Sequence, residues 1–134
     1  MFSANNEEQW KEIQRTIVTS DYYIVIIGHK YGSLTDSGIS YTEKEYDYAA
    51  SLGIPIMAFI RDRDVAITGD KRESDPAIVG KLDDFIRKVK ERMCNEWKTG
   101  EDLAGSVAIA IAQSISRYPR PGWIRNEEQD VESV

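Results

Sequence analysis

The residues best suited to chemistry lie between two apolar runs of the chain, from Gly28 to Glu45. The segment 28–33 (GHKYGS) follows the first run, and its glycines permit close approach of the backbone to a phosphate or a sugar. His29 is the only histidine, and an imidazole can contact a phosphate or act as an acid. The alternative interpretation is a solvated loop histidine beside Lys30.

Glu45 is the candidate catalytic residue. It lies one turn into a helix predicted for residues 42–52, near the expected edge of a sheet. A carboxylate there can accept hydrogen bonds from sugar hydroxyls or stabilise an oxocarbenium-like transition state, which is its role in glycosidic bond cleavage. The alternative is structural, because Thr42-Glu43-Lys44-Glu45 has the form of a capping box. The spacing alone leaves both interpretations open.

The start of this helix is a candidate anion site, because its free N–H groups and positive dipole end attract negative charge. Tyr31 and Tyr41 can stack on a base or a nicotinamide ring, or can simply plug the sheet edge. The spacing of Gly28 and Gly32 is equally compatible with an ordinary turn. The candidate ligand-binding residues are Gly28, His29, Tyr31, Gly32, Ser33, Ser40 and Tyr41.

Two apolar runs must position these residues. Residues 22–27 and 54–60 lack polar alternation, which predicts strands buried on both faces of a parallel sheet. The helix between them completes a right-handed strand–helix–strand unit. Ligands of open parallel sheets bind outside the carboxyl ends of the strands, so segment 28–33 and the helix start are expected at the binding edge.

The remaining elements complete an α/β domain. Asn5 or Asn6 is predicted to cap a helix ending near Thr19, and Asp75-Pro76 to begin a helix reaching about Met93. Residues 61–74 are expected to form a charged, solvated loop, 94–97 a short edge strand, and 101–118 the last helix. Residues predicted to face inward include Trp10, Ile13, Ile17, Leu82, Phe85, Val89, Leu103, Val107, Ala110, Ile111 and Ile115.

Composition narrows the class of protein. The chain has 134 residues, enough for one domain. Its net charge of −6 disfavours nucleic acid as the main partner, because phosphate backbones require clustered Lys and Arg. The sequence contains no membrane-length apolar run and no signal-peptide pattern. The single Cys94 is expected to be inert core, predicts no metal site, and fits a reducing, cytoplasmic location.

Several segments resemble the bacterial family of domains of unknown function numbered 4062. These are 20–28 (SDYYIVIIG), 31–33 (YGS), 38–49 (GISYTEKEYDYA) and 119–125 (PRPGWIR). The resemblance covers about residues 2–125, which we expect to form one domain followed by a disordered acidic tail over 126–134. It implies a small, three-layer parallel α/β fold that is TIR-like, or flavodoxin-like.

The same family resembles TIR domains and nucleoside 2-deoxyribosyltransferases. Residues 45–49 (EYDYA) followed by 52–55 (LGIP) are similar to the deoxyribosyltransferase pattern Glu-x-x-Tyr-Ala before Leu-Gly-x-Pro, whose glutamate is catalytic. Residues 41–45 are also similar to the aromatic-x-x-x-Glu of NAD-cleaving TIR domains. Both similarities imply the catalytic role for Glu45 rather than Glu43.

The resemblance also implies a departure at the start of the chain. The family begins with a Val-Phe-Ile-Ser-Ser-like strand, a helix and a second strand, and this chain starts just after them. This predicts an N-terminally truncated domain with an exposed sheet edge.

Two hypotheses about function follow from the residues and the resemblance. The domain binds a nucleotide or NAD, needs no other cofactor, and cleaves an N-glycosidic bond. Alternatively it is a non-catalytic, homo-oligomeric association or signalling module of a larger bacterial protein, such as a defence protein.

Overall fold

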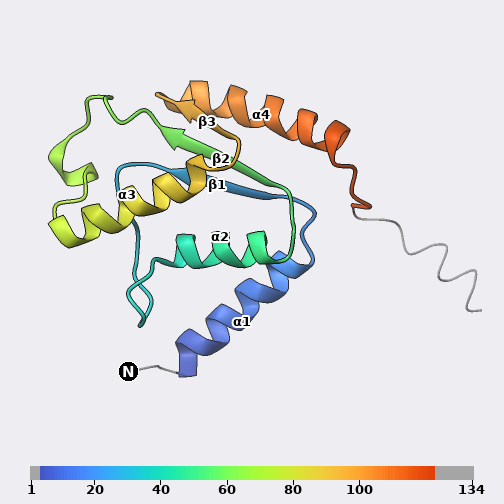
Figure 1. Ribbon diagram of the computed structural model, residues 1–134, viewed down its shortest axis with the longest axis horizontal. Coiled ribbons are helices and arrows are strands. Elements are labelled where there is room, and N and C mark those ends of the chain that lie inside the picture. The colour runs from blue at the N-terminus through green and yellow to red at the C-terminus, as the bar shows by residue number, and fades with distance from the viewer. Residues whose placement is uncertain (1–3, 123–134) are drawn as a thin grey trace, which may run out of the picture.

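The computed structural model describes residues 4–122, which form one sheet with helices on both faces (Figure 1). Three strands, β1 (Tyr23–Ile27), β2 (Ile56–Arg61) and β3 (Cys94–Trp97), alternate with helices. The helices are α1 (Ala4–Val18), α2 (Tyr41–Ser51), α3 (Pro76–Lys90) and α4 (Gly100–Arg117), with a short 3₁₀ turn, η1 (Gly69–Lys71), before α3.

The strands are parallel and lie in the order β1-β2-β3. Val25 pairs with Ala58, which in turn pairs with Cys94. Helices α2 and α3 are the crossovers between successive strands, as parallel pairing requires. The predicted fold class, a small parallel α/β domain of flavodoxin-like form, is therefore confirmed, and the short edge strand expected at 94–97 is present as β3.

The larger core lies between one sheet face and helices α2 and α3. Val25, Ile27 and Ile60 pack there against Phe85 and Val89 of α3. Tyr46 of α2 completes it, with its ring edge-to-face on Phe85. Asp75 caps α3 by accepting from the Ala77 N–H, and Pro76 follows at the first helical position, as the sequence predicted.

Helix α4 covers the other face of the sheet, where it packs on β2 and β3. Met57 and Phe59 are buried against Ala110 there. The predicted inward residues Leu103, Val107 and Ile111 join this cluster, whereas Ile115 is exposed, contrary to expectation. Ile115 lies near the end of α4, beyond Ile111, the last α4 residue in this cluster.

Strand β1 is buried on one face only, so the expectation of two buried faces is wrong for this strand. Its side chains alternate, with Val25 and Ile27 buried and Ile24 and Ile26 37% and 49% exposed. The physical reason is that α4 lies over β2 and β3 and does not extend across β1 (Figure 1). Within residues 4–122 the outer edge of β1 pairs with no strand.

Two helix starts differ from their predictions. Helix α1 begins at Ala4, so Asn5 and Asn6 lie inside it rather than at its cap. Helix α2 begins at Tyr41 and is capped by Ser40, whose side chain accepts from the Glu43 N–H. The proposed tail at 126–134 lies outside the described residues.

Candidate functional site

The segment after β1 is held by residues that follow β2 and precede α3. Arg63 donates from Nη1 to the Gly28 carbonyl oxygen at 2.6 Å. The Glu73 N–H donates to the His29 carbonyl oxygen at 2.9 Å. A Cβ built on Gly28 would meet no atom within 4 Å, so open space lies beside this backbone. Three separate chain segments therefore meet at residues 28–29.

His29 is buried, with only 6% of its surface exposed, so the interpretation as a solvated loop histidine is wrong. A hydrogen bond with the main chain of Asp62 holds the imidazole. Its Nε2 has no hydrogen-bond partner among the described residues. Burial lowers the pKa of His29, and the positive charges of Arg63 and Arg72 lower it further.

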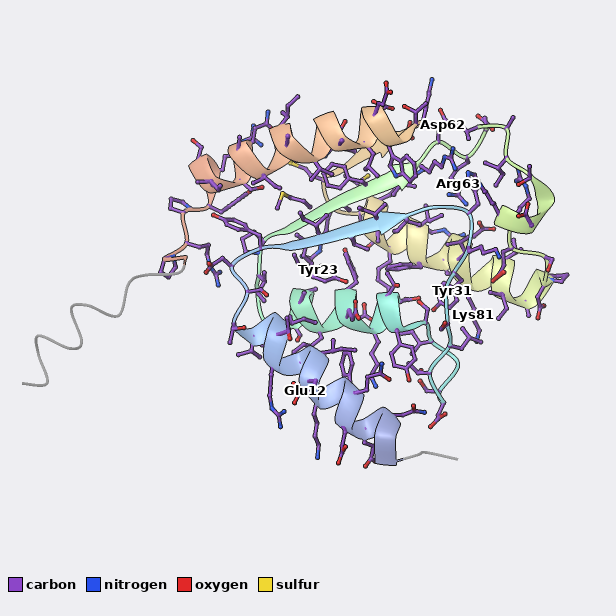
Figure 2. The ribbon with its side chains drawn as sticks, turned by 180° about the vertical axis from the view of Figure 1, so that it is seen from behind. Glu12, Tyr23, Tyr31, Asp62, Arg63 and Lys81 are labelled. Atoms are coloured by element: carbon purple, nitrogen blue, oxygen red, sulfur yellow. The ribbon has the colours of Figure 1, made fainter. Side chains whose placement is uncertain are left out.

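His29 lines a hollow of about 230 Å³ at the carboxyl ends of β1 and β2. Figure 2 shows Arg63 beside the arrowheads of these strands. The hollow combines an imidazole, two guanidinium groups, two carboxylates and an apolar wall. Its lining residues are His29, Arg63, Arg72, Glu73, Val79, Leu82 and Asp83.

The sequence analysis missed every lining residue except His29. Arg63 was assigned to a solvated loop because charges alternate over 61–64. In the structure Arg63 is half-buried, and burial lowers its pKa while the nearby Asp83 carboxylate acts in the opposite direction. One signal was present, since the chain after β2 must leave the sheet at the same edge as the chain after β1.

Tyr31 belongs to a packed polar cluster rather than to an open surface. Its ring is buried edge-to-face on Phe85, and its hydroxyl donates to the Glu43 carboxylate. Lys88 donates to Glu43 and also to Asp47, the latter at 2.9 Å. Of the two interpretations left open for Tyr31, stacking on a ligand and plugging the sheet edge, this geometry favours plugging.

The remaining candidate residues shape the turn before α2. Gly32 adopts a φ of 95°, which a residue with a side chain rarely tolerates. The Ser33 carbonyl oxygen accepts from the Tyr41 N–H at 3.0 Å. Ser40 is fully buried and caps α2, so the capping box proposed for Thr42 to Glu45 is wrong. These residues hold the loop against the helix start, and none of them lines the hollow at His29.

Glu45 lies elsewhere in the molecule. Its half-exposed carboxylate accepts a hydrogen bond from the Tyr23 hydroxyl at 3.3 Å, and burial raises the pKa of Glu45. Tyr23 is the first residue of the five-residue strand β1, about 13 Å from the last one. Figure 2 shows Tyr23 set back along β1 from Arg63. The structure therefore does not bring Glu45 together with His29, and its catalytic role stays a prediction.

Residues 1–112 match the family model described as a domain of unknown function, DUF4062. The chain belongs to the DUF4062 family. No curated protein and no solved structure matches it. In the described part of the DUF4062 domain, no helix is long and apolar enough to cross a bilayer, and no cluster of His, Cys, Asp or Glu is arranged to hold a metal ion.

The buried imidazole predicts a pH-dependent stability for the DUF4062 domain. Because the pKa of His29 is lowered by folding, the unfolded chain takes up the proton first as the pH falls below about 6.5. The folded domain keeps its full stability above that pH, and the contribution of the neutral His29 is lost as the pH falls toward the pKa of His29 in the folded protein. The free energy of unfolding, measured by urea denaturation, should therefore fall less between pH 7.5 and pH 5.5 in His29→Gln than in the wild type. An identical loss in both proteins would contradict the assignment.

Proposed function

We propose that the DUF4062 domain binds a nucleotide, with the phosphate held in the hollow around His29. The observation that carries the proposal is a buried imidazole whose Nε2 has no partner among the described residues, on a residue that lines the same hollow as Arg63 and Arg72. Buried polar atoms in folded proteins nearly always have a partner, so an unpaired one beside a cleft calls for an explanation, such as a bound water, an ion or a functional role.

The chemistry of the lining supports a phosphate. Guanidinium groups present a planar fork of N–H donors that matches phosphate oxygens. Arg63 and Arg72 place two of these groups beside a neutral imidazole, although the whole chain carries a net charge of −6. The position outside the carboxyl ends of parallel strands is where open α/β sheets bind nucleotides.

Arg72 offers the cleanest test, because it is exposed and makes none of the main-chain bonds that Arg63 makes. Adenosine monophosphate should raise the melting temperature of the wild type, since a ligand of the native state stabilises it. Arg72→Gln should weaken binding about tenfold or more, the effect of losing a charged hydrogen bond. Arg87→Gln is the control and should bind adenosine monophosphate normally, because Arg87 pairs with Asp84 outside the hollow. Equal affinity in both variants, or no saturable binding, would refute the proposal.

Cleavage of the N-glycosidic bond by Glu45 is a separate part of the proposal. Because its pKa is raised, the Glu45 carboxyl keeps its proton to a higher pH than an ordinary glutamate, which suits acid or base chemistry. If Glu45 is catalytic, the protein releases nicotinamide from NAD, and Glu45→Gln lowers the rate at least about 100-fold. The exposed Glu96 serves as the control, since Glu96→Gln should retain the rate. Absence of release by the wild type, or an active Glu45→Gln, would rule out this role without affecting the binding test.

A second candidate function, self-association, is favoured by the uncovered face of β1. Parallel sheets normally have both faces covered, yet Ile24 and Ile26 are exposed beside an unpaired strand edge. We propose that a second copy of the chain covers this face.

Light scattering tests the association directly. The wild type should become dimeric as its concentration rises, and Ile26→Lys should remain monomeric because a charge is then placed in the interface. Ile109→Lys is the matched control, since Ile109 is equally apolar and 62% exposed, but lies on α4. A wild type that stays monomeric at every concentration would refute the association.

A further inference from the structure

Two carboxylates share the hollow with the two arginines. Glu73 is fixed beside His29 by its main-chain bond to the His29 carbonyl oxygen. Asp83 projects from α3 into the same lining and acts electrostatically on Arg63. A ligand carrying only phosphate would meet both signs of charge, and the carboxylates would oppose its binding. The lining therefore suits a ligand that offers hydrogen-bond donors next to its anion.

The unpartnered Nε2 of His29 also suits a ligand that offers hydrogen-bond donors. Since Nε2 has no partner, the bond to the main chain of Asp62 uses the other ring nitrogen. That bond raises the pKa of His29, the sign expected when the imidazole donates to a carbonyl oxygen. In a neutral imidazole the second nitrogen is then an acceptor. Nε2 is accordingly suited to an O–H donor from the ligand.

The size of the hollow limits how much of a nucleotide it can enclose. Its volume of about 230 Å³ is below the roughly 300–1,000 Å³ of pockets that enclose a drug-sized molecule. Val79 and Leu82 supply the apolar part of the wall, which suits the carbon face of a sugar ring. A sugar phosphate matches this combination of size, charge and apolar surface, and a whole dinucleotide does not.

We infer that the hollow takes a phosphorylated sugar, with the phosphate on Arg63 and Arg72 and the sugar hydroxyls on His29, Glu73 and Asp83. The inference rests on the proposed nucleotide binding and specifies which part of the nucleotide is enclosed. The base then lies outside the hollow, and the free hydroxyl groups distinguish the ligand from a simple anion.

Calorimetric titration of the full chain with ribose 5-phosphate, adenosine monophosphate and inorganic phosphate tests this assignment. Ribose 5-phosphate should bind the wild type at least about tenfold more tightly than inorganic phosphate, because the hydroxyls add charged hydrogen bonds. Asp83→Ala should reduce the ratio of the two affinities several-fold. It removes an acceptor for the sugar hydroxyls, which weakens ribose 5-phosphate, and it removes a negative charge that repels inorganic phosphate. Asp84→Ala, the exposed neighbour on α3, should leave the ratio unchanged.

The outcomes separate the inference from the proposed function. If inorganic phosphate binds as tightly as ribose 5-phosphate, the hollow is a plain anion site and the inference is wrong while phosphate binding stands. If the ratio is large but identical in Asp83→Ala, the assignment of the hydroxyls to Asp83 is overturned. If none of the three ligands binds, the proposed nucleotide binding fails as well.

Discussion

Because β1 and β2 run parallel, with Ile27 paired to Ile60, the segments that follow them leave the sheet at the same edge. Everything in the hollow depends on this pairing. It places Arg63, which follows β2, against the carbonyl of Gly28, which follows β1. The crossover from β2 to β3 then returns through Arg72 and Glu73 into α3, which closes the third side.

Two of the buried polar residues in the described part of the chain, Glu43 and His29, differ in character. Around Glu43, each polar side chain has a partner: the Tyr31 hydroxyl and the Lys88 ammonium both bond to its carboxylate. Such a satisfied network fixes how α2 and α3 pack together. At His29, the imidazole bonds to the main chain of Asp62 but its Nε2 has no partner among the described residues, and the residue lines a hollow that also contains charged side chains. The first arrangement has its polar atoms paired, whereas the second leaves Nε2 of His29 without a partner among the described residues.

The thin sheet explains the exposed surface of β1. One helix, α4, covers one face, and it lies over β2 and β3 (Figure 1). Ile24 and Ile26 are therefore left in water, although their residue types are those of a buried strand. Ile24 and Ile26 point to the face of the sheet opposite α3, whereas α3 lines the hollow at His29.

The sequence by itself determined the elements and their order. Apolar runs marked the strands, Asp75-Pro76 marked the start of α3, and residues 38–49 carried the resemblance to the family that the chain proved to match. These features depend on neighbours a few positions apart, where periodicity and capping are informative. Only the tertiary structure decided that His29 is buried beside Arg63 and that Glu45 contacts Tyr23. Those contacts depend on strand pairing and helix packing, which act between residues distant in the chain and leave no local pattern.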